Sequence, residues 1–148
     1  MFDILHKVGI RSSTQDVYRA LTTLPGLAGW WTNDTRGSCD SGGVIEFHFG
    51  TRGYFKTKVL VLEPAKRVVW QVVEGPEEWV GSTISFDLNQ DGDEATVFFK
   101  HQGWKAQSEF MHHCSTKWAT FLMSLKALAE TGTGAPFPDD IRISVNWD

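Results

Sequence analysis

The sequence predicts an α+β fold in which a curved antiparallel sheet of six to seven strands wraps around one long C-terminal helix. Apolar residues recur at three- and four-residue steps through residues 108–130, the spacing that lines up one face of a helix. Earlier segments alternate apolar and polar residues, as strands with one buried face do, and short turn sequences separate them. Strands joined by short turns pair as antiparallel neighbours, and their buried faces need the helix to cover them.

The long helix has start and stop signals as well as an apolar stripe. Ser108 can cap its start with Glu109 in the first turn, while Lys126 lies near its end and Gly132 follows as the residue that stops it. A stripe with this much aromatic surface is not stable in water, so we expect the sheet to grip it. The stripe consists of Phe110, Cys114, Trp118, Phe121, Leu122, Leu125 and Leu128.

The N-terminal third predicts one strand and two short helices. Residues 2–10 alternate in the manner of a strand, with His6 on the apolar side. Ser12 and Gln15 then form a capping-box pattern for a short amphipathic helix, which Pro25 and Gly26 should stop. Residues 27–31 predict one more helical turn.

The middle of the chain predicts the remaining strands, at residues 45–49, 54–62, 67–73, 81–88 and 95–101. Glycine- or proline-containing turns separate them, and Asp91-Gly92 is a tight hairpin signal. After the long helix we expect a loop over residues 131–138 and an extended tail over residues 141–147 that docks back on the body.

Composition restricts the classes of partner. The 148 residues fit one domain, 1–148, and a net charge of −4 without any cluster of lysine or arginine excludes binding driven by phosphate contacts, so we expect no nucleic acid partner. No signal peptide and no apolar run approaching the ~20 residues of a membrane span are visible, so we expect no membrane partner and a cytoplasmic protein. Cys39 and Cys114 form no C-x-x-C pattern, and we expect both to be reduced.

Several motifs in fixed order give the sequence a family resemblance. They are Trp30-Trp31, Gly42-Gly43 before a Phe-rich strand, Arg67 to Trp70, His101 to Trp104 before the long helix, and Thr133 to Pro138 behind it. In these motifs the whole chain resembles the START-like superfamily (SRPBCC, Bet v-like, polyketide cyclase), and within it the family of homologues of the activator of heat-shock-protein-90 ATPase. The resemblance implies a helix-grip fold with a pocket between sheet and helix, and no particular reaction, because this superfamily hosts many activities.

The candidate ligand-binding residues are those that should face such a pocket. His6 and His101 fall in register with the apolar residues of their strands, so each could orient a ligand or act as a general base; the alternative is a hydrogen-bonded histidine in the core. His113 and Lys117, one turn apart on the edge of the stripe, face either the pocket or solvent. The full set is His6, Trp31, Phe47, Tyr54, Trp70, Trp79, Phe86, Phe99, His101, His113, Lys117 and Phe121.

Two further questions stay open at this stage. Trp30, Trp31, Trp79 and Trp104 fall at the ends of elements, where they either form an aromatic mouth or cap the core. Phenylalanines such as Phe47, Phe55, Phe86, Phe99 and Phe121 could also fill the gap between sheet and helix and leave no pocket.

No metal or other cofactor is expected. Consecutive helical residues are about 100° apart around the axis, so His112, His113 and Cys114 cannot close on one ion. Neither a G-x-S-x-G nucleophile elbow nor a phosphate-binding glycine loop occurs.

The sequence therefore favours a binder of a small apolar or amphipathic molecule, present as a monomer or a homodimer. One alternative is a protein-interaction or chaperone-regulating module of the type in the family name. The other is a cyclase- or hydrolase-type enzyme that uses His6 or His101.

Overall fold

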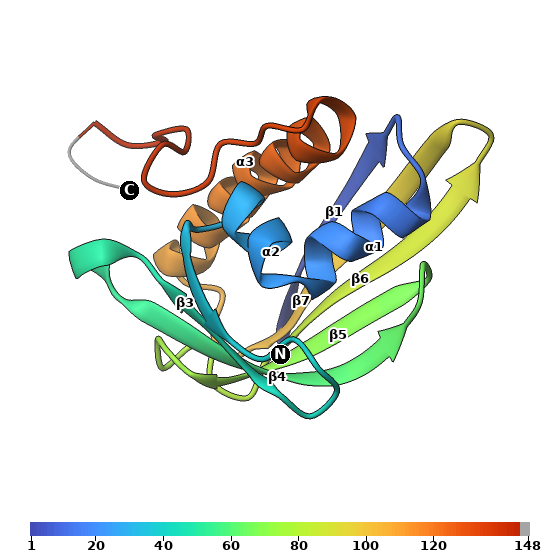
Figure 1. Ribbon diagram of the computed structural model, residues 1–148. Coiled ribbons are helices and arrows are strands. Elements are labelled where there is room, and N and C mark those ends of the chain that lie inside the picture. The colour runs from blue at the N-terminus through green and yellow to red at the C-terminus, as the bar shows by residue number, and fades with distance from the viewer. Residues whose placement is uncertain (146–148) are drawn as a thin grey trace.

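The computed structural model describes residues 1–145 and confirms the predicted α+β fold, with one seven-stranded antiparallel sheet (Figure 1). All three α-helices of this part of the chain lie on the same side of the sheet. The elements are β1 (Phe2–Ile10), α1 (Thr14–Thr22), α2 (Leu24–Trp30), β2 (Asp34–Gly37), β3 (Val44–His48), the 3-10 helix η1 (Gly50–Arg52), β4 (Tyr54–Glu63), β5 (Arg67–Glu74), β6 (Thr83–Asp91), β7 (Glu94–Trp104) and α3 (Glu109–Thr131).

The sheet runs in the order β1-β7-β6-β5-β4-β3-β2, and every neighbouring pair is antiparallel. Apart from the pairing of β1 with β7, each strand pairs with the next one along the chain, as short turns require. The register places Phe86 opposite both Phe99 and Val68, so that inward-facing side chains form one continuous layer. That layer is the floor on which the helices pack.

The long helix α3 begins and ends where the sequence predicts. The Ser108 hydroxyl accepts from the Met111 N–H, and Gly132, with φ of 89°, ends the helix in the left-handed conformation. Its buried side is Met111, Cys114, Trp118, Phe121, Leu122, Ser124 and Leu125, and Phe110 and Leu128 pack against the core as partly buried side chains. The prediction that the sheet grips this stripe is confirmed.

Two predicted helix boundaries near the N-terminus are wrong. Ser13, not Ser12, caps α1, because its hydroxyl accepts from the Asp16 N–H. The second error concerns Pro25, which does not stop a helix but lies in the first turn of α2, where its missing N–H costs no hydrogen bond. Thr23, which caps α2, separates the two helices.

The strand β2 (Asp34–Gly37) was not predicted. It is short, polar and at the edge of the sheet, so its sequence lacks the alternation that marks the other strands. Smaller boundary errors occur at β6, which begins at Thr83 rather than residue 81, and at β7, which continues to Trp104.

The segment after α3 packs along α2 and α3 rather than ending in an extended tail. Phe137 donates its N–H to the Trp31 carbonyl and accepts from the Asn33 N–H, while the Ala135 N–H donates to the Ser124 hydroxyl. Residues 141–145 form no strand, and Val145 is 97% exposed. The start of this part does contact the body, because the Ile141 carbonyl accepts from Lys117 of α3. The rest of that predicted tail, including Trp147, lies outside the described residues.

Over residues 1–145, no helix combines the length and the apolar character that crossing a membrane requires.

Candidate functional site

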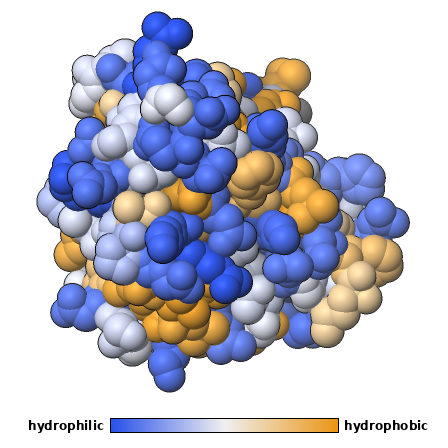
Figure 2. Space-filling model, turned by 90° about the vertical axis from the view of Figure 1, so that its right-hand side faces the viewer, coloured by the Kyte–Doolittle hydropathy of each residue, from blue (hydrophilic) through white to orange (hydrophobic). Residues whose placement is uncertain are grey.

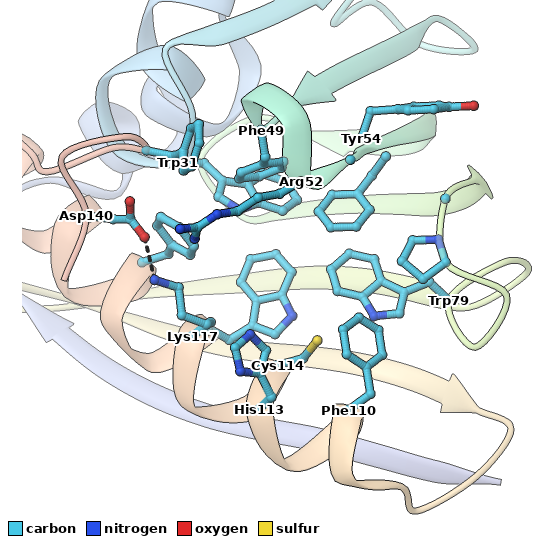
Figure 3. Close-up of a pocket in the computed structure, with 17 residues that line it drawn as sticks. Trp31, Phe49, Arg52, Tyr54, Trp79, Phe110, His113, Cys114, Lys117 and Asp140 are labelled. Atoms are coloured by element: carbon cyan, nitrogen blue, oxygen red, sulfur yellow. Dashed lines mark hydrogen bonds and ion pairs between the residues drawn. The ribbon is translucent and has the colours of Figure 1, made fainter. Parts of the chain in front are cut away.

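A pocket of about 710 Å³ lies between the first half of α3 and the facing ends of β4 and β5 (Figure 3). Its volume falls in the range of about 300–1,000 Å³ that is typical of small-molecule sites. Five parts of the chain supply its wall. These are Trp31 at the end of α2; Phe49, Arg52, Gly53, Tyr54 and Phe55 around the start of β4; Gly75, Pro76 and Trp79 after β5; Phe110, His113, Cys114, Lys117, Trp118 and Phe121 on α3; and Phe137 and Asp140 behind it.

Stacked aromatic rings form most of this wall. Phe55 stacks on Trp79, with centroids 4.1 Å apart and planes 15° apart, and on Trp31 at 6.0 Å and 22°. From the helix side, Trp118 contacts Trp31 at 4.8 Å and lies nearly parallel to Trp79 at 6.1 Å. Rings packed on one another in this way have little freedom to turn, so the wall is preformed.

The two indole N–H groups of this wall differ in their hydrogen bonding. Trp118 Nε1 donates to His101 Nδ1 at 3.2 Å. By contrast, Trp79 Nε1 is buried and makes no hydrogen bond of ordinary geometry. Its neighbour Cys114 is a weak acceptor: burial raises the pKa of that thiol to about 12, and the Trp79 N–H offsets only part of the rise.

Charged side chains gather at one end of the pocket (Figure 3). Lys117 forms an ion pair with Asp140, and the two side chains are only 12% and 8% exposed. The same ammonium donates to the Ile141 carbonyl at 2.8 Å and lies 5.1 Å from the ring centre of Phe121. Arg52 lies over the ring of Phe137, at 5.8 Å, so this end presents cations framed by aromatic rings.

His101 lies behind the pocket, fully buried, with both ring nitrogens engaged. An indole N–H can only donate, so the bond from Trp118 assigns the acceptor role to Nδ1 and the proton to Nε2. Nε2 then donates to Ser82 Oγ at 2.8 Å, and the Ser82 hydroxyl donates to the Trp79 carbonyl. Burial lowers the pKa of His101 to about 3, which keeps this imidazole neutral.

Six of the twelve candidate residues from the sequence line the pocket. These are Trp31, Tyr54, Trp79, His113, Lys117 and Phe121. The sequence could indicate His113, Lys117 and Phe121 of α3, because the apolar stripe and its edge predict which side chains of a helix face the sheet.

The other six candidate residues lie elsewhere. His6 faces α3 at its partly buried flank, where Nε2 lies 3.1 Å from the Ser115 carbonyl oxygen. His101 is sealed behind Trp79 and Trp118. The remaining four, Phe47, Trp70, Phe86 and Phe99, are at most 1% exposed and fill the core between the sheet and the helices.

The four tryptophans at the ends of elements divide between the two alternatives, an aromatic mouth and caps of the core. Trp31 and Trp79 belong to the pocket wall, whereas Trp30 and Trp104 are fully buried outside it. Trp30 donates its indole N–H to the Ala20 carbonyl. The N–H of Trp104 is buried, and no atom of the described residues accepts a hydrogen bond from it.

Sequence reasoning missed the polar groups that come from irregular segments. Arg52 lies in η1 and Asp140 follows the docked Phe137, and neither position carries a periodic signal. Phe49, Phe55, Phe110 and Cys114 had been assigned to strands or to the helix stripe without a role in a site. No group of three or more His, Cys, Asp or Glu side chains within residues 1–145 is placed to hold a metal ion.

Comparison with known proteins gives one family and several solved structures. Residues 11–130 match the model of the family described as activator of Hsp90 ATPase homolog 1-like protein. The Aha1 dimer from Colwellia psychrerythraea, solved in solution, is 44% identical over 90% of this chain and all of that one, with a TM-score of 0.83.

Two more distant structures support the fold alone. Protein MLL2253 from Mesorhizobium loti is 18% identical, with a TM-score of 0.76 over 86% of this chain and 96% of that one. CalU16 from Micromonospora echinospora is also 18% identical, with a TM-score of 0.75 over 99% of this chain and 75% of that one. Among proteins with curated descriptions, none matches.

Proposed function

The chain belongs to the family of activator of Hsp90 ATPase homolog 1-like proteins, and on that premise we propose that it binds a small apolar or amphipathic molecule between α3 and the sheet. The observation that carries the proposal is the preformed pocket, whose wall combines stacked aromatic rings with charged groups at one end. Such a combination of apolar lining and a few convergent polar groups is typical of ligand sites.

The apolar wall alone supports only modest affinity. A ligand that loses about 250 Å² of apolar surface gains about 6 kcal/mol at about 25 cal/mol/Å², and association costs several kcal/mol of that. Selectivity must therefore come from the polar groups of the wall. His113, Lys117 and Arg52 are the side chains that supply it in this proposal.

Catalysis by His6 or His101 does not form part of the proposal. A general base must lie within hydrogen-bonding distance of a bound substrate, and neither imidazole lines the pocket. His101 in addition uses both nitrogens inside the protein.

We also propose that the protein is a homodimer in the cytoplasm. The Colwellia relative is described as a dimer, and at 44% identity it matches this chain along its own full length. Cys39 and Cys114 are both free thiols, which suits a reducing compartment.

Native mass spectrometry of freshly purified protein, followed by thermal unfolding with fatty acids, flavonoids and aromatic polyketides, tests the binding proposal. We expect a retained small molecule, or a rise in melting temperature of about 5–10 °C with at least one ligand at about a hundredfold its dissociation constant. A ligand-free spectrum together with no thermal shift from any of these compounds would contradict it.

Two adjacent histidines of α3 provide a matched pair of variants for the same assay. His113→Trp places a large ring in the pocket and should abolish the ligand-induced shift. His112→Trp changes an exposed neighbour outside the wall and should leave the shift unchanged. Equal loss in both variants would show that the ligand does not occupy this pocket.

A further inference from the structure

The strand β1 lies at one edge of the sheet and can still accept a neighbour. Within residues 1–145 it pairs on one side only, with β7. The strand β2 at the opposite edge has four residues, whereas β1 has nine. Short edge strands restrict pairing with other chains, while a long one offers a row of N–H and C=O groups without partners in the sheet. Of the two edges, β1 is therefore the one suited to dock a further strand.

The odd-numbered residues of β1 direct their backbone groups toward this edge. In an antiparallel ladder the N–H and C=O of one residue point to the same side, and successive residues alternate. The Gly9 carbonyl identifies the odd side as the open one, because it accepts from Lys126 of α3. Followed through the pairing registers, the backbone bonds between β5 and the turn before β6 give the same assignment. The backbone groups of Asp3, Leu5 and Lys7 therefore lie along the rest of the edge.

The side chains of these three residues lie on the face of the sheet away from the helices. Asp3, Leu5 and Lys7 are all exposed, and Leu5 is 62% exposed. The even-numbered residues point the other way, since Ile4 is buried and His6 contacts α3. The edge thus presents an acidic, an apolar and a basic side chain at steps of two residues.

This order of side chains is complementary to itself. Two copies of β1 that pair antiparallel must match edge-directed residues with each other. If Leu5 lies opposite Leu5 of a second copy, Asp3 lies opposite Lys7 of that copy, and Lys7 opposite its Asp3. A shift of the register by two places Asp3 opposite Leu5 or opposite Gly9, and a shift by four sets like charges against each other. Only the first register pairs opposite charges with each other and leucine with leucine, the combination that stabilises cross-strand pairs.

The helix α3 supplies apolar surface next to this edge. One flank of the helix contacts β1, through Ser115 at His6 and through Lys126 at Gly9. Met123 lies about 80° around the helix axis from Ser115, on the side away from the core, and is 51% exposed. Antiparallel pairing keeps the helix faces of both sheets on the same side, so a second copy would bring its own α3 beside this one. The two Met123 side chains then add apolar contact to a strand pairing that alone is smaller than an ordinary interface.

We propose that a second copy of this chain docks on the edge of β1, so that the two sheets join across a two-fold axis between the paired Leu5 residues. The three matched pairs exchange about six backbone hydrogen bonds, and the two charged pairs flank the apolar one. A second copy is the occupant that the self-complementary charges favour, and the 44% identical Colwellia relative is described as a dimer. This inference rests on the homodimer of the proposed function, because it names the interface of that dimer.

Sedimentation velocity over about 1 to 100 µM, with two matched variants, tests the edge. Leu5→Lys sets like charges opposite each other at the centre of the pairing, so the dimer dissociation constant should rise at least about tenfold. Phe98→Lys adds the same charge on the same face of the neighbouring strand β7, where Phe98 is 42% exposed, and should leave the dimer intact. Equal weakening in both variants would indicate sheets packed face to face and would overturn the edge pairing.

An exchange of charges tests the register. Asp3→Lys alone turns both flanking pairs into like charges and should weaken the dimer roughly tenfold. Adding Lys7→Asp to the same chain restores two pairs of opposite charge, so the double variant should dimerise roughly tenfold more tightly than Asp3→Lys. Both proteins lack the bond from the Gly103 N–H to the Asp3 carboxylate, so their difference reports the charge pairs.

The outcomes separate this inference from the homodimer itself. A wild-type protein that sediments as single chains at about 100 µM would overturn both. A wild-type dimer that Leu5→Lys leaves unchanged, or a double variant that dimerises no more tightly than Asp3→Lys, would overturn the β1 interface and leave a homodimer formed elsewhere.

Discussion

His101 shows how one buried residue positions the wall of a site that it does not touch. Its two nitrogens connect Trp118 to Ser82, and through the Ser82 hydroxyl to the carbonyl of Trp79. A neutral imidazole satisfies this chain with one donor and one acceptor, whereas a protonated one would aim a second N–H at the indole N–H. The geometry therefore requires the neutral form, in agreement with the pKa near 3.

The burial of neutral His101 predicts a loss of stability in mild acid. Its pKa is about 3 when folded and about 6.5 when unfolded, so between these values the unfolded chain binds the extra proton. The contribution is fully present above about pH 6.5 and decreases as the pH falls, by about 2 kcal/mol between pH 7 and pH 5. Urea unfolding at several pH values measures it.

His101→Gln serves as the control for that measurement. Glutamine can accept from Trp118 and donate to Ser82 but does not titrate in this range. The variant should therefore lack the part of the pH dependence that belongs to residue 101 while keeping the contribution of the carboxylates. Parallel pH profiles for the two proteins would contradict the assignment of a buried neutral histidine.

At the scale of elements, the sequence is informative where a pattern repeats and silent where it does not. The helix α3 has 23 residues, so its buried face follows from the spacing of its apolar residues, and its ends follow from Ser108 and Gly132. The edge strand β2 has only four residues and no apolar side chain, and it forms because β3 offers an open edge. Strand alternation also predicts that His6 and His101 face inward, but not which point along a strand meets a pocket.

The capping-box pattern placed the start of α1 one residue too early, at Ser12 rather than Ser13. Alanine variants of the two serines test which one caps the helix. Ser13 caps the helix through its side chain, whereas Ser12 contributes backbone groups, with its N–H donating to Ile10 and its carbonyl accepting from Gln90. Ser13→Ala should destabilise the protein by about 1 kcal/mol, or about 4 °C in melting temperature. Ser12→Ala should change stability by less than about 0.5 kcal/mol.

Differential scanning calorimetry of these two alanine variants distinguishes the alternatives. A larger loss for Ser12→Ala than for Ser13→Ala would restore the capping box predicted from sequence. A loss of stability in Ser13→Ala alone would instead show that the hydrogen bond from the Asp16 N–H to the Ser13 hydroxyl holds the first turn of α1.

At the scale of the whole molecule, long-range packing decides what the sequence could not. The pocket gains the carboxylate of its charged end because the segment after α3 returns to pair with Trp31 and Asn33 through Phe137, which brings Asp140 to Lys117. Trp31 and Asp140, which lie more than 100 positions apart in the sequence, thus belong to one wall together with residues of β4 and η1. The pattern of apolar and polar residues predicts which face of a helix or strand is buried, but it does not predict which distant segments come into contact.

The surface carries enough exposed apolar side chains for a homodimer interface, but these side chains do not form one patch that marks it. Figure 2 shows apolar side chains reaching one face of the molecule in separate patches among hydrophilic ones. Several large apolar side chains are exposed, including Leu5 at 62% and Phe98 at 42% on the adjacent strands β1 and β7. A dimer interface of ordinary size covers about 800 Å² per partner, roughly a tenth of the 7554 Å² accessible here.

Sedimentation velocity tests the proposed homodimer, with an expected mass of twice the 16.6 kDa of one chain. The dimer should predominate at about 100 µM, since an interface of standard size supports about micromolar affinity or better. We expect the mass to stay unchanged when a pocket ligand is added or when His113, in the pocket wall, is replaced by Trp. Sedimentation as a single 16.6 kDa species at this concentration would contradict the dimer, and a mass that changes with ligand would mean that the pocket and the interface are coupled.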